Sequence, residues 1–301
     1  MSPKRSCPVC GAGSLEARSF LKSSVDPARL DQFSYASRKT PEYMNLNLVQ
    51  CFRCDLVYAD EPPSQDDLAH AYHVADYDSA EEADDAAATY IHAMQPLLDA
   101  LPRRESALEI GSGTGALLEP LAQQGFTELV GVEPSAAAIA AAPRHRQSWI
   151  REGVFEEQDF APESFDLICC FMTMEHVLDP KVISLAAFRL LRPGGAFVTV
   201  THDYRGRLNR LLGRRSPIID IEHMQLFSDP SIRTLFEISG YRDVRVQRLI
   251  NRYAFRYWWR LTPAPGPVKR AVAKGAEAVR LGGVKLGLNV GNSMTSGVKP
   301  G

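Results

Sequence analysis

The chain contains 301 residues, of which 45% are hydrophobic, and its formal net charge at pH 7 is -2. This length can hold one large α/β domain and one small module around a real core, and the small net charge argues against a protein built to bind nucleic acid. No stretch is long and apolar enough to span a bilayer, and the N-terminus lacks the apolar core of a secretory signal, so we expect a cytoplasmic protein.

The first predicted unit, residues 1–59, carries two C-x-x-C pairs. In a reducing cytosol this spacing indicates a metal site rather than disulfides, and four thiolates complete the tetrahedral shell of a structural zinc ion. A redox C-x-x-C pair is the alternative, which two pairs together disfavour. We therefore predict a small zinc-ribbon-like module with strands of its own. Its predicted zinc ligands are Cys7, Cys10, Cys51 and Cys54.

Residues 60–104 are predicted to form a helical linker. A polar, proline-bearing segment leaves the cysteine module, and apolar spacing then indicates a helix, an acidic turn and a second helix. Residues 60–100 contain many Asp and Glu and neither Lys nor Arg, whereas residues 242–301 are strongly basic. The small net charge therefore conceals two oppositely charged regions.

Residues 108–115, LEIGSGTG, are the most informative stretch. An apolar strand runs into a helix through Gly111, Gly113 and Gly115, which let the backbone turn tightly and bring a ligand against bare amides. Glu109 precedes the loop, and a second apolar strand ends at Glu133, close to the separation at which doubly wound folds place a carboxylate on a cofactor ribose. These features predict a nucleoside-cofactor cradle. The glycines alone also satisfy the dinucleotide-binding pattern.

Helix and strand patterns alternate after this loop, as a doubly wound, mainly parallel α/β sheet requires. A later helix is predicted between its N-cap Ser228 and Gly240, and the alternating RDVRVQRLI forms a strand after it. Cys169 and Cys170 lie in an apolar run and are interpreted as buried core residues. The core strands are expected near residues 106–110, 128–132, 147–151, 165–171 and 195–201.

Two further motifs, FDLICCFMTMEHV and LRPGG before the strand AFVTV, complete a recognisable set. In this order, the glycine loop, the two acids and these motifs resemble the class I S-adenosylmethionine-dependent methyltransferases from about residue 77 to about residue 250. The resemblance implies a Rossmann-like, seven-stranded core over residues 105–250. It also implies a last antiparallel edge strand within 290–301, which makes residues 251–289 an insertion.

The resemblance implies S-adenosyl-L-methionine as cofactor. Glu109 and the glycine amides would hold its methionine portion, and the two oxygens of Glu133 match the ribose diol. The alternative for Glu109 is a strand-end acid that caps the loop, and the alternative for Glu133 is a solvated loop acid. For the aromatic and Met side chains, the alternative is packing in the core. The candidate cofactor residues are Tyr77, Glu109, Gly111, Ser112, Gly113, Gly115, Glu133, Pro134, Gly153, Val154, Phe155, Phe171 and Met172.

Three histidines are candidates for a general base. Methyl transfer is an in-line displacement that depends on positioning, but a hydroxyl or enol acceptor must also lose a proton, and histidine accepts one near neutral pH. His223 and His176 rank above His202, and each has hydrogen-bonded packing as its alternative role. The auxiliary candidates, with surface-loop roles as the alternative, are Asp203, Tyr204 and Glu222.

The acceptor is expected to be a small molecule. Amine methyltransferases of this class that act on adenine or glutamine carry an Asn-Pro-Pro-Tyr type motif where this chain reads FMTMEHV, which favours oxygen or carbon. A four-cysteine module before such a domain resembles bacterial sugar and natural-product methyltransferases. Deoxysugar C-methyltransferases usually carry a further C-terminal domain for which this sequence has no room. An RNA methyltransferase and a non-catalytic adaptor are the other hypotheses.

The basic, aromatic segment 251–289 allows two interpretations. Two amphipathic helices, broken at Pro263 to Pro267, would cap the sheet with their aromatic face, and this interpretation is favoured because insertions of this kind shape acceptor pockets. Alternatively, the aromatic residues among arginines would contact a membrane surface or an anionic substrate.

Overall fold

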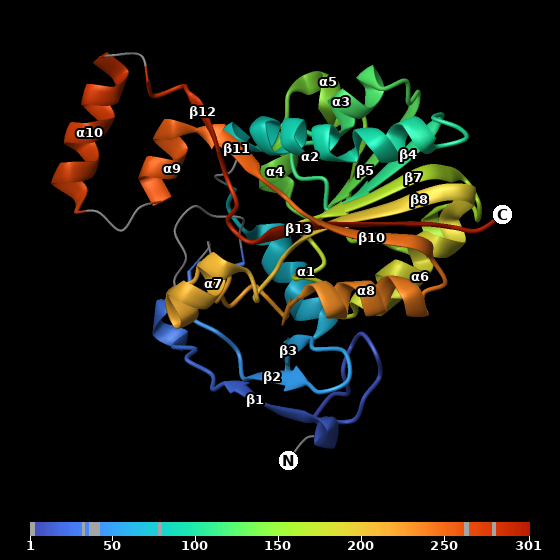
Figure 1. The fold of residues 1–301 in the computed structure, drawn as a ribbon, viewed down its shortest axis with the longest axis horizontal. Helices are drawn as coiled ribbons and strands as arrows, with labels where there is room; N and C mark the ends of the chain where they lie inside the picture. Colours follow the sequence, from blue (N-terminus) through green and yellow to red (C-terminus); the bar gives the residue numbers. More distant parts are fainter. Residues whose placement is uncertain (1–3, 32–33, 36–42, 78–79, 262–264, 279–280) are drawn as a thin grey trace.

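The computed structural model describes residues 4–31, 34–35, 43–77, 80–261, 265–278 and 281–301. Its centre is a seven-stranded sheet in the order β10-β13-β8-β7-β4-β5-β6 (Figure 1). The sheet is parallel except for β13, which runs antiparallel to both β8 and β10. These strands are β4 (Ser106–Ile110), β5 (Glu128–Glu133), β6 (Ile150–Glu152), β7 (Phe165–Phe171), β8 (Leu191–His202), β10 (Arg242–Arg248) and β13 (Asn292–Val298). The expected α/β fold is confirmed.

Two strand predictions need correction. The last strand is antiparallel as expected but does not lie at the edge. β13 is inserted between β8 and β10, where its backbone groups pair on both sides, and the mostly exposed β10 forms the edge. The strand expected at 147–151 begins at Ile150, because residues up to Gln147 form the short helix α5 (Arg144–Gln147).

Helices cover both faces of the sheet (Figure 1). Leu167 and Cys169 face α2 and α3, whereas Ile168 and Cys170 face α6 and α8, as the alternation of a fully buried strand requires. Both cysteines have no exposed surface, which confirms them as core residues. The helices are α1 (Gln65–Val74), α2 (Ala80–Ala100), α3 (Leu118–Gln123), α4 (Ala136–Ala141), α6 (Pro180–Leu190), α7 (Arg207–Leu212) and α8 (Asp229–Ile238). Single 3-10 turns are η1 (Ser14–Glu16), η2 (Pro27–Arg29), η3 (Glu157–Asp159) and η4 (Gly213–Arg215).

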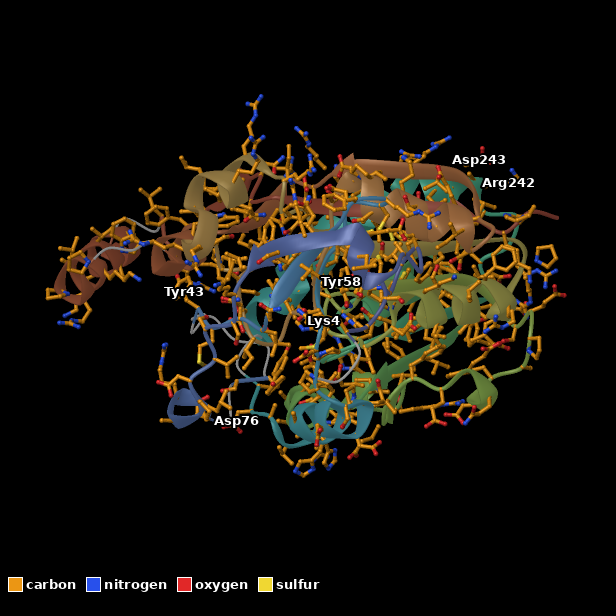
Figure 2. The ribbon with its side chains drawn as sticks, turned by 90° about the horizontal axis from the view of Figure 1, so that it is seen from below. Lys4, Tyr43, Tyr58, Asp76, Arg242 and Asp243 are labelled. Atoms are coloured by element: carbon orange, nitrogen blue, oxygen red, sulfur yellow. The ribbon has the colours of Figure 1, made fainter. Side chains whose placement is uncertain are left out.

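The cysteine module contributes strands to a second sheet that it shares with the α/β core. β1 (Ala17–Leu21), β2 (Leu48–Cys51) and β3 (Val57–Ala59) form an antiparallel sheet, and β9 (Gln225–Leu226) from the core adds a fourth strand against β3. In Figure 2 these strands cross the front of the molecule, with Tyr58 near its centre and Arg242 at the far end of the large sheet. Tyr58 lies on β3, which pairs with β9, and it has no exposed surface. The module therefore packs directly against the core.

The insertion is a hairpin with two helices, which corrects the prediction of a purely helical cap. β11 (Asn251–Ala254) pairs with β12 (Lys285–Leu288), and α9 (Phe255–Leu261) and α10 (Gly266–Ala278) lie between them. β11 packs against α2, and the helices project away from the sheet (Figure 1). The aromatic rings of Tyr253, Tyr257 and Trp258 pack on one another. Of the expected break at Pro263 to Pro267, residues 262–264 lie outside the described residues.

Candidate functional site

The glycine loop joins β4 to α3 at the carboxyl edge of the sheet. Gly111 and Gly113 have φ angles of +76° and +52°, which L-residues with side chains rarely adopt. A Cβ at Gly111 would lie 2.2 Å from the Thr173 hydroxyl oxygen, so the loop passes directly against the end of β7. The Gly111 N–H donates to the carbonyl oxygen of Val132 at 2.9 Å, which ties the loop to β5. The sequence pattern requires glycine at these turns for this reason.

Glu109 fits the cationic end of the expected cofactor. Its side chain is buried, and its Oε2 has no hydrogen-bond partner among the described residues. Burial raises the pKa of Glu109 well above its ordinary value, and the charge of Glu133 raises it further. A buried carboxylate of this kind is stabilised when a cation pairs with it, as an ammonium group would.

Glu133 lies where the ribose of the cofactor is expected. Its Oε2 accepts a hydrogen bond from the Gly113 N–H at 2.7 Å, and its Oε1 accepts one from the Ser135 N–H at 2.8 Å. Burial raises the pKa of this carboxyl group, and the two amides oppose that rise. Each carboxylate oxygen keeps a second lone pair, so the backbone has fixed an acceptor pair for a diol.

The remaining cofactor candidates surround these two acids, with one exception. The Gly153 N–H donates to the Glu133 carbonyl at 3.0 Å, which places the segment of Val154 and Phe155 beside the predicted ribose site. Ser112 and Gly115 belong to the loop itself, Pro134 follows Glu133, and the Tyr77 hydroxyl lies 3.9 Å from where a Gly113 side chain would begin.

Phe171 is the exception, because its ring packs edge-on against Tyr90 at a centroid distance of 5.0 Å in the core beside α2. This contact favours packing over ligand binding. Met172 follows it with a φ of +52°, and its N–H donates to the Val200 carbonyl at 2.8 Å. A left-handed non-glycine residue at the end of β7 turns the chain sharply toward the histidine-bearing loop.

The four cysteines of the module meet as predicted. Their sulfur atoms all lie within 4.8 Å of one another, and all four thiols are free. The closest pairs join the two knuckles: Cys7 to Cys54 at 3.5 Å and Cys10 to Cys51 at 3.6 Å. Sulfur atoms around one tetrahedral zinc ion lie about 3.8 Å apart, given Zn–S bonds of about 2.3 Å. The cluster therefore has the donor set and the spacing of a closed, four-thiolate metal site.

The three candidate histidines come together, although 47 positions separate the first from the last. The ring centroids of His176 and His223 are 4.8 Å apart, and those of His202 and His223 are 5.5 Å apart. His202 ends β8, and His176 lies in the loop after β7, so both occupy the carboxyl edge of the sheet. The His176 N–H donates to the Thr173 carbonyl, and Thr173 in turn contacts the glycine loop.

Hydrogen bonds and burial set the protonation of this cluster. The His202 Nδ1 atom lies 2.9 Å from the Asn292 Oδ1 atom, and the His223 Nδ1 atom lies 3.0 Å from the Ile218 carbonyl oxygen. Because both partners are acceptors, each Nδ1 carries the proton and each Nε2 carries a lone pair. Burial lowers the pKa of His176 and of His202 to about 4, which keeps both rings neutral at pH 7. Burial also raises the pKa of Glu175, below the cluster, to about 7.

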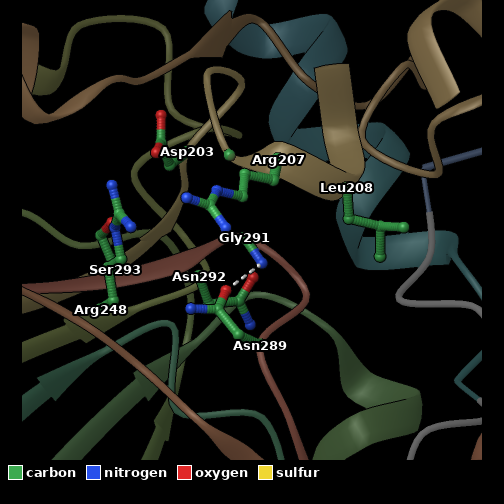
Figure 3. Close-up of a pocket in the computed structure, with 9 residues that line it drawn as sticks. Asp203, Arg207, Leu208, Arg248, Asn289, Gly291, Asn292 and Ser293 are labelled. Carbon is green, nitrogen blue, oxygen red and sulfur yellow. Dashed lines mark hydrogen bonds between the residues drawn. The ribbon is translucent and has the colours of Figure 1, made fainter. Parts of the chain in front are cut away.

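A cavity of about 300 Å³ opens beside Asn292, the residue whose Oδ1 atom contacts His202 (Figure 3). Asn292, which positions His202, lines it together with Arg207, Arg248 and the auxiliary candidate Asp203. Sequence reasoning missed the two arginines, since Arg207 begins α7, Arg248 ends β10, and only the fold brings them together. The cavity offers both cationic and amide groups to a polar molecule.

The cysteine module holds the segment that carries His223. The Arg5 guanidinium donates to the Leu178 carbonyl at 2.9 Å, and the Ala59 N–H donates to the Met224 carbonyl at 2.8 Å. Asp55, which follows the last cysteine, accepts hydrogen bonds from Arg205 at 2.5 Å and from Ser228 at 2.7 Å. A further bond runs from the Tyr204 hydroxyl to the Asp55 carbonyl at 3.1 Å, so Tyr204 has a positioning role.

The sequence profile of a family described as Methyltransferase domain matches residues 80–246, more than half of the chain. The chain belongs to this methyltransferase family. With the seven-stranded fold and the glycine loop, it is a class I S-adenosylmethionine-dependent methyltransferase. Within the described part of the chain, every helix is too short or too polar to cross a membrane.

Curated relatives match only part of this methyltransferase. The ubiquinone biosynthesis O-methyltransferase of Pseudomonas fluorescens is 32% identical over 120 residues, which are 36% of this chain and 50% of that protein, and the Pseudomonas entomophila enzyme of the same name is 31% identical with the same coverage. The chain thus spans about half the length of the curated relatives it matches. A possible histamine N-methyltransferase from Thermotoga maritima superposes with a TM-score of 0.50 and 21% identity, over 73% of this chain and 93% of that one, which shows the shared fold.

Proposed function

We propose that this enzyme transfers the methyl group of S-adenosylmethionine to an oxygen atom of a small-molecule acceptor, and that a histidine of the cluster takes the acceptor's proton. The observation that carries the proposal is the meeting of three imidazole rings beside the glycine loop, two of which, His176 and His202, burial keeps neutral at pH 7. An amine acceptor can attack without a buried base, whereas a hydroxyl must lose a proton. The curated relatives are O-methyltransferases, which supports oxygen as the acceptor atom.

The residues of this chain would divide the work between two sides. Glu109 would pair with the ammonium group of the cofactor, and Glu133 would hold its ribose. The cofactor, when bound, would supply the electrophilic methyl group. An Nε2 lone pair of the histidine cluster would accept the acceptor's proton. Positioning and exclusion of water supply most of the remaining acceleration in such a displacement.

The polar cavity and the cysteine cluster fit a small acceptor. The cavity beside Asn292 has room for a small polar molecule, and Arg207 and Arg248 suit one with an anionic group. We propose that the four cysteines bind a structural zinc ion, since a complete set of thiolates leaves no position for water or substrate. Zinc would then stabilise the module, whose bonds to Met224 and Ser228 hold the segment that carries His223.

A transfer assay tests the proposal. Purified enzyme with labelled S-adenosylmethionine is offered phenols, catechols, sugars and an extract of the native host, and mass spectrometry locates the new methyl group. We expect a methyl ether on a small molecule. Transfer only to RNA, with binding that weakens steeply as salt rises, would replace the proposal with the RNA methyltransferase hypothesis. Tight cofactor binding with no transfer to any acceptor would favour the adaptor.

A further inference from the structure

The histidine cluster contains a set of metal-binding groups that the transfer chemistry does not require. His176, Glu222 and His223 each offer one ligand atom, and these atoms all lie within 4.8 Å of one another. The His176 Nδ1 atom is 3.7 Å from the Glu222 Oε2 atom and 3.2 Å from the Glu222 carbonyl oxygen, so binding a metal through Nδ1 requires the tautomer whose proton is on Nε2. Two ligands of one tetrahedral ion with bonds of about 2.1 Å lie about 3.4 Å apart, so a shift of a few tenths of an ångström would complete the pair.

The surroundings orient these groups as in a metal site. The His223 Nδ1–H donates to the Ile218 carbonyl, and this bond directs the Nε2 lone pair into the cluster. Metal-bound histidines characteristically donate their second ring N–H to a backbone carbonyl or a carboxylate. Tyr72 covers the other side, with its ring 6.1 Å from that of His176 and its hydroxyl donating to the Glu222 carbonyl at 3.4 Å.

The charge of the cluster also favours a cation. The side chains of His176 and Glu222 are only 20% and 12% exposed, and His223 is 6% exposed. Glu175 lies directly beneath with no exposed surface, its carbonyl accepts the Met224 N–H, and its Oε2 has no hydrogen-bond partner among the described residues. A largely buried carboxylate beside two histidine rings, with an unpartnered carboxyl oxygen of Glu175 next in the chain, is a donor set that suits a divalent cation.

We propose that His176, Glu222 and His223 bind one divalent transition-metal cation, such as Mn²⁺, Co²⁺ or Zn²⁺, which holds the acceptor oxygen. Two imidazoles and one carboxylate suit these ions and leave coordination positions open for substrate. The proposal rests on the proposed O-methylation and refines it: two of the three histidines become ligands, and His202 becomes the proton acceptor.

The reaction balances with the groups at hand. Coordination lowers the pKa of the acceptor hydroxyl, whose proton passes to the Nε2 atom of His202. An oxygen lone pair then forms the O–CH₃ bond while the C–S bond breaks, and its electron pair stays on sulfur. The products are a methyl ether, a neutral thioether and one proton, and neither oxidant nor reductant is consumed.

Manganese binding tests the site without any acceptor. The full chain, with zinc in the cysteine cluster and loosely bound metal removed by chelation, is titrated with Mn²⁺, and electron paramagnetic resonance follows the loss of the free-ion signal. We expect about one Mn²⁺ per chain and at least a tenfold weaker affinity in Glu222→Gln and in His223→Ala. The control His145→Ala removes an exposed histidine that pairs with Glu119 at 3.2 Å, and it should bind like the original protein.

Three further readouts keep the test decisive. S-adenosylmethionine affinity should stay unchanged in both ligand variants, which shows that they fold. Should either fail to fold, electron spin echo modulation of the unaltered protein with Mn²⁺ must show nitrogen couplings from imidazole, and their absence overturns the site. Equal Mn²⁺ affinity in all variants, or no binding, also overturns it. Mn²⁺ binding with no transfer to any hydroxyl would instead sink the proposed function and leave the site standing.

Discussion

The proposed cofactor side and the proposed acceptor side of the site are built in different ways. The cofactor side comes from neighbouring parallel strands, β4, β5 and β6, and its loops are bonded directly to one another. The acceptor side joins the loop after β7, the end of β8, the segment before β9 and the N-terminal module. A site made of adjacent loops depends on local geometry, whereas the acceptor side depends on contacts between residues far apart in the chain.

The largest test of this comparison is removal of metal from the cysteine cluster. A strong chelator should lower the unfolding free energy by several kcal/mol, since structural zinc contributes about 10–16 kcal/mol of binding in isolated modules. Loss of the module frees β9 and Met224, so acceptor turnover should fall before cofactor binding does. Thermal unfolding and calorimetry with S-adenosylmethionine measure the two effects. An unchanged melting temperature in metal-free protein would contradict the structural role.

Glu133→Ala is the matching test on the cofactor side. The substitution removes an acceptor pair for the ribose and releases the Gly113 and Ser135 amides, so we expect cofactor affinity to fall about 100-fold, or about 2.7 kcal/mol. Glu128→Ala, at the exposed start of the same strand, is the control. Calorimetric titration with S-adenosylmethionine measures both. Equal affinities would remove Glu133 from the binding site.

The same contrast explains which features the sequence could predict. Glycines 111, 113 and 115 lie within five positions and have one structural reason to be there, so the cradle, the strands around it and Glu133 could be placed without coordinates. The chemistry of histidine also made His176, His202 and His223 candidates for a general base, but the contact between their rings comes from the fold. The pairing of β3 with β9 was not predictable, because β9 has two residues and no period of its own. The interior position of β13 follows from sheet order, which a single strand's pattern does not encode.

Asp55→Asn examines how the module reaches the acceptor side. The variant keeps the shape of the side chain but weakens charge-assisted bonds to Arg205 and loses an acceptor for Gln50 or Ser228. We expect KM for the acceptor to rise about tenfold, or about 1.4 kcal/mol, with cofactor affinity unchanged. Arg53→Ala, exposed in the same knuckle, is the control. A rise in both constants would mean that the whole fold had been disturbed.

Glu109→Gln should have the smallest effect on stability, and its sign is opposite to that of the other changes. Burial and Glu133 raise the pKa of Glu109 in the folded protein above its unfolded value of about 4.5, so ionisation opposes folding as the pH rises through that value. The neutral amide removes this cost. We expect the cofactor-free variant to gain about 1 kcal/mol, a few degrees in Tm, at pH 7, and nothing near pH 4, where both states are protonated.

The same variant should bind S-adenosylmethionine more weakly, because an amide cannot pair with the ammonium group as a carboxylate does. Melting curves from pH 4 to pH 8, with and without cofactor, separate the two effects. A cofactor-free variant less stable than the original at pH 7 would show that the Glu109 carboxylate already has a stabilising partner. Greater stability together with full cofactor affinity would show that the methionine end of the ligand lies elsewhere. Higher stability without cofactor, together with weaker cofactor binding, would show that the buried Glu109 carboxylate destabilises the free enzyme and serves to bind the ligand.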